Sequence, residues 1–325
     1  MVKIAIEKND AGQRLDRFLR KYFREAPLAA IYRIIRKSLK VNGKRAGENT
    51  RLQEGDELSL FISPEQAEEW RGKGTVRTSP RQFTVIYEDE HVLIVSKPSG
   101  LLTHGDGREK SRTLANQVLG YLQEKGEFDP AKEQTFRPSP ANRLDRNTSG
   151  LVMFGKSAQA MRQLTESLRE RDAIRKFYRT IAAGAFSEEQ IITGDLVKDE
   201  AENRVREVSG VDGAKAAATR AYPIRTGEDF SLVEVELLTG RTHQIRVHMA
   251  GIGHPLAGDP KYGDPKINEI ARRHGITTQL LHACRLEFGE MDGALEGLCG
   301  KTVEAPAPKA FVRGERELIH VGKQR

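Results

Sequence analysis

The feature that most restricts the fold is a series of strand-length apolar segments in the last three-quarters of the chain. These segments are residues 83–87, 91–97, 177–183, 215–225, 230–238 and 279–288. Helix-like stretches lie between them at residues 113–122, 158–171 and 264–275. Period-two and continuous apolar runs are typical of strands, whereas apolar residues at i, i+3 and i+4 are typical of helices. Strands joined by short turns with inserted helices predict an α+β domain around a mixed, mostly antiparallel sheet.

The first 62 residues carry a different pattern. A strand pattern at residues 2–6 is followed, from Gln13 on, by the spacing of an amphipathic helix. After Pro27 we expect a second helix, whose buried side carries Leu28, Ile31, Ile34 and Ile35. The dipeptide Asn42-Gly43 predicts a tight hairpin turn, and alternation at residues 58–62 predicts a closing strand.

Basic residues gather on one edge of this small unit. They are Arg33, Arg36 and Lys37 on the outer side of the second helix, with Lys40 and Lys44 beside the turn. The whole chain has a net charge of +7, which favours a polyanionic partner. A basic run can also be a plain solvated face, but bases on one edge of a defined module favour contact with RNA phosphates.

A third feature is the turn from Asn142 to Gly150, in which Asp145 lies between Arg143 and Arg146. Prolines and asparagines around it predict irregular backbone. Neighbouring guanidinium groups lower a carboxyl pKa by about 1–3 units, so we expect Asp145 to be ionised. An ionised carboxylate suits a nucleophile or a charge stabiliser. The alternative is an Asx-turn or helix cap with a surface salt bridge.

This turn resembles the catalytic loop of the RluA-type pseudouridine synthases, written His-Arg-Leu-Asp-x-x-Thr-Ser-Gly, with Asn142 in place of the usual histidine. Two more blocks resemble the same family: Lys176-Phe177-Tyr178 before a strand, and residues 238–248 continuing to Gly258-Asp259. The blocks occur in the family's order over more than half of the chain. The small N-terminal unit resembles the S4 RNA-binding domain, an arrangement found in RluC-like members.

The resemblance implies an activity: isomerisation of uridine to pseudouridine in RNA, with large-subunit (23S) ribosomal RNA or an assembly intermediate as the expected substrate. The bond from ribose C1′ to N1 breaks and C1′ joins C5, with no redox change. No cofactor is expected, and the sequence has no dinucleotide-binding or phosphate-binding glycine motif.

The resemblance also assigns roles to residues. Asp145 is the catalytic acid, Arg246 its basic neighbour (with Arg241 the runner-up), and Tyr178 the pocket tyrosine that stacks on the target base. Leu281 matches an apolar residue that lines the family's pocket. The structural alternatives are that Tyr178 is an ordinary half-buried strand tyrosine and that Leu281 is an ordinary core leucine. The expected RNA-binding residues of this domain are Arg143, which fills the space left by the displaced base, together with Arg146 and Lys176, which bind phosphates.

Length and composition are compatible with this reading. A chain of 325 residues can form two domains, which we expect at 1–65 and 83–325, joined by a linker at 66–82. No apolar run approaches the roughly 20 residues of a spanning helix, and the N-terminus lacks the apolar segment of a signal peptide. Cys284 and Cys299 have no ligand-like spacing, which favours free thiols in a reducing cytoplasm.

Other assignments were weighed against these. His243 and His248 are five residues apart, off the spacing of a helical zinc pair, so we expect no metal site and histidines that bond to backbone or RNA. A nucleoside hydrolase, a non-catalytic RNA-binding or ribosome-assembly factor, and a tRNA-directed synthase of the same family are the alternatives. The identity of the modified uridine and the oligomeric state stay open, and no obligate protein partner is evident.

Overall fold

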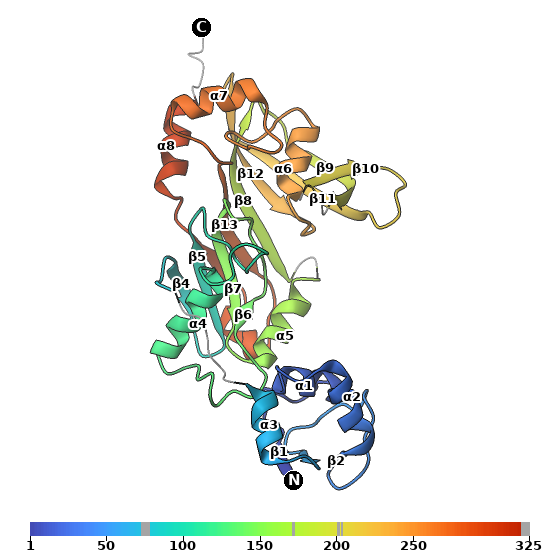
Figure 1. The fold of residues 1–325 in the computed structure, drawn as a ribbon. Coiled ribbons are helices and arrows are strands. Elements are labelled where there is room, and N and C mark those ends of the chain that lie inside the picture. Colours follow the sequence, from blue (N-terminus) through green and yellow to red (C-terminus); the bar gives the residue numbers. More distant parts are fainter. Residues whose placement is uncertain (73–78, 171–172, 200–201, 203, 320–325) are drawn as a thin grey trace.

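Two separate β-sheets divide the protein into an N-terminal unit and a much larger C-terminal unit (Figure 1). The computed structural model describes residues 1–72, 79–170, 173–199, 202 and 204–319. The N-terminal unit contains β1 (Val2–Ala5), α1 (Leu15–Tyr22), α2 (Leu28–Lys37), β2 (Leu39–Val41), β3 (Glu57–Leu60) and α3 (Pro64–Arg71). Its three strands pair in the order β1-β3-β2, and all these pairings are antiparallel.

The helices of the N-terminal unit follow the predicted pattern. Leu15, Phe18 and Leu19 of α1 are buried, so the i, i+3, i+4 face packs into the core as expected. Leu28 was predicted to be buried, but it is the first residue of α2 and half of its surface is exposed. The expected tight turn is present, because Asn42 and Gly43 both have positive φ, at 50° and 76°.

The stretch expected to be a linker contains a helix. In α3, Ser63 caps the N-terminus by accepting from the backbone N–H of Gln66, and Pro64 occupies the first turn. Ala67 belongs to the N-terminal core, and the Trp70 ring lies edge-on to Phe23 at 6.0 Å between centroids. The expected linker at 66–82 therefore begins within a helix that packs on the N-terminal core, and residues 73–78 lie outside the described part.

The large unit has one long twisted sheet with helices around it (Figure 1). Its elements are β4 (Thr84–Glu88), β5 (Val92–Lys97), α4 (Leu114–Glu124), β6 (Ser139–Pro140), β7 (Ser149–Gly155), α5 (Ala158–Ser167), β8 (Ile174–Ala183), β9 (Gln190–Asp199), β10 (Arg204–Val208), β11 (Lys215–Arg225), β12 (Phe230–Leu237), α6 (Gln244–Gly251), α7 (Pro265–Arg273), β13 (Leu281–Phe288), the 3-10 helix η1 (Gly293–Leu298), β14 (Thr302–Glu304) and α8 (Lys309–Leu318).

The sheet order is β10-β9-β11-β12-β8-β13-β7-β5-β4, with β14 beside β13 and β6 beside β7. Among the described strands, β7 and β13 form a parallel pair and the other pairs are antiparallel. The predicted α+β fold with a mixed, mostly antiparallel sheet is confirmed.

Where β7 meets β13, Gly150 has φ +115°, and a Cβ at that position would lie 2.1 Å from the carbonyl oxygen of Ala283. Only glycine permits this close approach of the two strands.

The two faces of the central sheet differ in character. Successive side chains of a strand point to opposite faces, so Lys176 and Tyr178 of β8 share one face and Arg175 and Phe177 share the other. On the second face three arginines meet three glutamates in ion pairs: Arg175, Arg179 and Arg285 with Glu234, Glu236 and Glu287. The charges of these three arginines are therefore balanced by the three glutamates on this face.

Some elements differ from the expectation. Strands β9 and β10 were not predicted. β10 forms the edge of the sheet with β9 next to it, and the two bury only isolated residues such as Ile192 and Leu196. Helix α8 lies in a part of the chain for which no helix was predicted, and it buries Phe311 and Leu318, seven residues apart. Residues 241–243 form a turn that leads directly into α6.

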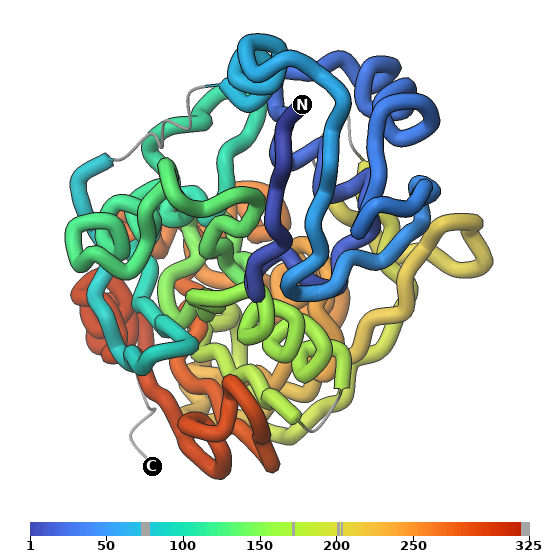
Figure 2. The backbone as a smooth tube through the Cα atoms, turned by 90° about the horizontal axis from the view of Figure 1, so that it is seen from below, coloured from blue at the N-terminus to red at the C-terminus, as the bar shows by residue number. Residues whose placement is uncertain are grey.

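The N-terminal unit contacts the large one near its lower end, beside α5 and the segment containing Thr135 (Figures 1 and 2). Gln13 Nε2 donates to Thr135 Oγ1 at 2.9 Å, and Asn9 Oδ1 accepts from the backbone N–H of Ala158 at 3.2 Å. The two units therefore share specific hydrogen bonds as well as the covalent connection. Among the described helices, none combines the length and the apolar character required to cross a lipid bilayer.

Candidate active site

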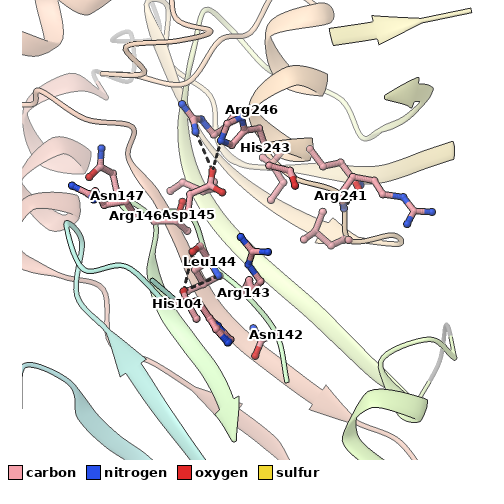
Figure 3. A pocket seen from close by; sticks show the side chains of 18 of the residues that line it. His104, Asn142, Arg143, Leu144, Asp145, Arg146, Asn147, Arg241, His243 and Arg246 are labelled. Carbon is pink, nitrogen blue, oxygen red and sulfur yellow. Dashed lines mark hydrogen bonds and ion pairs between the residues drawn. The ribbon is translucent and has the colours of Figure 1, made fainter. Parts of the chain in front are cut away.

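A cleft of about 1590 Å³ opens over the face of the sheet that carries Tyr178. Its walls come from three parts of the chain that are distant in sequence: residues 102–109, the turn 141–148, and residues 237–246 before and within α6. Asp145, Tyr178, Arg246 and Leu281 all line it. The sheet therefore brings the three family-like blocks to one cavity. Figure 3 shows two of them, the turn around Asp145 and the segment with Arg241, His243 and Arg246.

The turn that carries Asp145 is held by neighbours on both sides of the acid. Thr103 Oγ1 donates to the carbonyl of Leu144 at 2.9 Å and accepts from its N–H at 3.2 Å. Lys97 is fully buried, and its ammonium donates to the carbonyls of Arg146, Leu101 and Pro98 at 3.0, 2.7 and 3.0 Å. These bonds fix the backbone immediately before and after Asp145.

Burial lowers the pKa of Lys97 to about 7, while the charge of Asp145 opposes the shift. Both effects have simple causes, since a buried ammonium loses hydration and a nearby carboxylate restores part of its stability. The lysine was missed by the sequence analysis. Its signal was a single cation at the end of the apolar strand 92–97, just before Pro98.

Asp145 is held by an arginine from the opposite wall. Arg246 NH1 donates to Asp145 Oδ2 at 3.0 Å, across 101 positions of sequence. Arg246 is in turn held by Asp259, whose two carboxylate oxygens accept from Nε at 2.7 Å and from NH2 at 2.8 Å. This fork geometry is the strongest arrangement available to an arginine and a carboxylate. The expected pairing of Arg246 with Asp145 is present in the structure.

The charges of this chain of groups are mutually stabilising. Burial alone would lower the pKa of Arg246, but the hydrogen bonds and charge of Asp259, with Asp145 beyond, raise it. Burial likewise opposes ionisation of Asp259, yet the hydrogen bonds and charge of Arg246 lower its pKa below the usual range. The sequence placed Asp259 at the end of a family-like block but predicted no role for it. In the structure it fixes the orientation of Arg246.

The arginines adjacent in sequence do not flank the carboxylate as expected. Arg146 points to Asp106, with 3.4 Å between NH2 and Oδ2, and Arg143 is exposed at the cleft. Arg241, the runner-up, is also exposed, and its Nε donates to the carbonyl of Ala216. In Figure 3 the dashed lines at the Asp145 carboxylate lead to Arg246 and His243. A turn directs neighbouring side chains apart, which is why sequence proximity misled here.

Tyr178, Leu281 and Lys176 form the floor of the cleft on β8 and β13. Tyr178 and Leu281 are buried, and Lys176 is partly buried. Burial, followed by the charge of Asp145, raises the pKa of Tyr178, so its phenol keeps its proton at neutral pH. Burial lowers the pKa of Lys176, and the charge of Glu236 opposes this.

His243 is a further cleft residue, for which the sequence predicted a bond to backbone or RNA and no metal. Its Nε2 lies 3.7 Å from Asp145 Oδ2, and its Nδ1 lies 2.8 Å from the Tyr262 hydroxyl. Within the described residues, no group of three or more histidine, cysteine or acidic side chains is arranged to hold a metal ion. His254 and His282 both bond to backbone carbonyls, and the two cysteines are free.

The comparisons with known proteins agree with this geometry. Residues 91–251 match the family model described as RNA pseudouridylate synthase. The chain is 32% identical over 290 residues to ribosomal large subunit pseudouridine synthase C of Vibrio parahaemolyticus, covering 88% of this chain and 87% of the relative. It is 33% identical over 291 residues to the Escherichia coli protein of the same name, covering 88% of each.

The chain belongs to the RNA pseudouridylate synthase family. It is an RNA pseudouridine synthase, an isomerase that acts on RNA, and the family predicted from the sequence is confirmed. The fold is shared with human RNA pseudouridylate synthase domain containing 4, with a TM-score of 0.57 at 20% identity over 72% of this chain and 92% of the human one.

The ion pair of Arg246 with Asp259 should be needed for both the stability and the activity of this RNA pseudouridine synthase. Asp259→Asn leaves the buried Arg246 without its compensating charge, so we expect a loss of about 3 kcal/mol in the free energy of unfolding and a marked fall in activity. Urea unfolding and single-turnover kinetics measure the two. Because the folded pKa of Asp259 is lowered, its contribution is present above its unfolded pKa of about 3.9 and is lost as the pH falls below it.

The matched control is Asp264→Asn, five positions further on. Asp264 caps α7 from an exposed position, and asparagine caps a helix equally well. We expect this variant to retain both stability and rate. Equal stability and rate for Asp259→Asn and the wild type would contradict the role given to the pair.

Proposed function

We propose that the protein isomerises specific uridines of large-subunit (23S) ribosomal RNA, with Asp145 as the catalytic carboxylate and without a cofactor. The observation that carries this proposal is the ion pair of Asp145 with Arg246 inside a cleft. The relatives described above are named for the ribosomal large subunit, which supports that class of target. A tRNA target within the same family is the alternative.

The isomerisation of uridine requires one carboxylate next to the sugar and the base. The C1′–N1 bond breaks, the base turns, C1′ bonds to C5, the proton on C5 is lost and N1 gains a proton, so no atom is gained or lost overall. A carboxylate can attack C1′, attack the base, or move a proton along a glycal route. Arg246 is suited to all three, because it compensates the negative charge of Asp145 in a partly buried site.

Tyr178 is proposed to bind the target base. Its ring is on the cleft floor and its hydroxyl stays protonated at neutral pH, so it stacks and donates a hydrogen bond, and it does not start the reaction as a base. Leu281 supplies apolar surface beside it. A uridine in a helix must be turned out at a cost of a few kcal/mol, and stacking on Tyr178 offsets part of this cost.

The cations that line the cleft are proposed to hold the RNA. Arg143 is exposed two residues before the acid, and its planar guanidinium can stack in the space left by the displaced base. Arg146, Lys176 and Arg241 line the same cleft and would contact phosphates. Because the opposite face of the sheet carries the balanced ion pairs, the cleft side is the side that attracts a polyanion.

The N-terminal unit is proposed to be an S4-like RNA-binding domain that extends through α3, with the catalytic domain starting near residue 83. Its basic edge is exposed: Arg33, Arg36, Lys37, Lys40 and Lys44. Phosphate contacts from such an edge add affinity that depends on salt. Because the relatives are ribosomal RNA enzymes, we propose the cytoplasm as the site of action.

Asp145→Asn tests the proposal. We expect the variant to fold normally and to lose pseudouridine formation, since asparagine has the same shape but no charge. Pseudouridine mapping across ribosomal RNA from cells with the wild-type gene, without the gene, and with the variant measures this. The sites missing without the gene should also be missing in the Asp145→Asn cells.

The control is Asp212→Asn, at an exposed turn between β10 and β11, which should restore every site. Pseudouridine that persists with Asp145→Asn would refute the role of the carboxylate and favour a non-catalytic RNA-binding protein. Abasic sites with free uracil would indicate a nucleoside hydrolase. Sites found only in transfer RNA would refute the ribosomal target.

The RNA-binding edge has its own test. The triple variant Arg36→Ala/Lys37→Ala/Lys40→Ala should weaken RNA binding and reduce the slope of log affinity against log salt by about 2 to 3. The control removes three exposed bases from α7, Lys266, Arg272 and Arg273, at the other end of the molecule (Figure 1). An unchanged slope for the first variant, or an equal change for both, would contradict a specific RNA-binding edge.

A further inference from the structure

His243 has an unusual backbone for its position. Among the described residues, Asn42 and His243 are the non-glycine residues with positive φ, and the hairpin turn accounts for Asn42. His243 has φ 54° and ψ 14°, the left-handed region, immediately before α6. Such a conformation costs about 1–3 kcal/mol and persists only where the surroundings impose it, which occurs mainly at functional sites.

The side chain of the next residue imposes this turn. Gln244 is buried, and its Oε1 accepts from the backbone N–H of Arg241 at 2.9 Å and from Thr239 Oγ1 at 2.8 Å. Its Nε2 donates to Ala218 and Thr219 of β11, each at 2.9 Å. Gln244 thus ties the turn to the sheet, and the imidazole of His243 is directed at the carboxylate of Asp145 (Figure 3).

The hydrogen bonds of Tyr262 identify the tautomer of His243. The Tyr262 hydroxyl accepts from the backbone N–H of Val205 at 2.8 Å, and His243 Nδ1 lies at 2.8 Å from the same hydroxyl. A phenol has one proton to donate, and among the described residues Nδ1 is the acceptor in reach. Nδ1 therefore accepts, and the ring hydrogen is on Nε2, the nitrogen that faces Asp145.

The imidazole carries no charge at neutral pH. Burial lowers the pKa of His243 to about 4, the charge of Asp145 opposes this shift, Arg246 and Lys261 add to it, and Asp259 opposes it. Oδ2 of Asp145 lies 3.0 Å from Nη1 of Arg246 and 3.7 Å from Nε2 of His243. Within the described part of the chain, neither of these contacts involves Oδ1. Oδ2 is thus held from two sides, whereas Oδ1 makes no hydrogen bond or ion pair with the described residues.

We propose that His243, as the Nε2–H tautomer fixed by Tyr262, is a positioning residue that holds Oδ2 of Asp145 together with Arg246 and so presents Oδ1 to the uridine. This inference rests on the proposed role of Asp145. Because His243 is a neutral donor, it can orient the carboxylate of Asp145 without adding a second positive charge beside Arg246. The 3.7 Å separation is longer than a hydrogen bond, and such contacts commonly tighten when the substrate binds.

Nuclear magnetic resonance of the full-length protein with ¹⁵N-labelled histidine tests the tautomer. The signals of His243 are identified by their absence from the His243→Asn variant. Between pH 6 and 8 we expect a protonated Nε2 and an unprotonated Nδ1, with no titration. A protonated Nδ1, or an imidazolium in this range, would overturn the proposal.

Single-turnover kinetics with saturating RNA separates positioning from backbone conformation. Asparagine tolerates the left-handed region well but has no donor at the place of Nε2, whereas glutamine reaches that place and fits the backbone less well. A positioning role predicts that His243→Asn loses about 100-fold in rate with little change in RNA affinity, and that His243→Gln recovers part of it. A purely structural role predicts the opposite order, and that order would refute the proposal.

Two further variants complete the design. His254→Asn should keep the wild-type rate, because the asparagine amide can replace its bond to the Ala183 carbonyl. If Asp145→Asn is inactive while His243→Asn keeps the wild-type rate, only this inference fails. If Asp145→Asn keeps its activity, the proposed function fails as well.

Discussion

The ion pair between Asp145 and Arg246 is the interaction on which the rest of the site depends. Neither partner can be placed by local structure, because they come from a turn and a helix 101 positions apart. The large sheet brings them together, and Asp259 holds Arg246 at a fixed angle from behind. A partly buried pair of this kind contributes little net stability, and Asp259 would still compensate the charge of Arg246 if Asp145 were replaced. Its presence is therefore better explained by chemistry than by folding.

Around this ion pair, the backbone is held by buried hydrogen bonds, whereas the basic side chains of the cleft are accessible to solvent. The backbone on both sides of Asp145 is fixed by Thr103 and by Lys97, a fully buried lysine whose three bonds all go to carbonyl oxygens. The exposed cations of the cleft stand in front of this support, where a flexible polyanion can reach them. On the far face of the sheet the arginines are paired with glutamates.

The sequence predicted the parts of the site that motifs encode, and it missed those that depend on tertiary contacts. Asp145, Tyr178 and Arg246 were proposed because each lies in a block that resembles the family, and the structure places all three at one cleft. The expectation that Arg143 and Arg146 flank the acid was wrong, because a turn directs neighbouring side chains apart. Strand β10 and helix α8 escaped prediction, since an edge strand and a C-terminal helix bury too few residues to show a period.

The central claim is that a uridine leaves its helix and meets Asp145 inside this cleft. The most direct measurement is a crystal structure of the Asp145→Asn protein bound to the RNA that the wild type modifies. We predict that the target uridine lies unstacked against Tyr178, with its ribose or base in contact with residue 145. A uridine still stacked in its helix, or bound in the cleft out of contact with residue 145, would contradict the account.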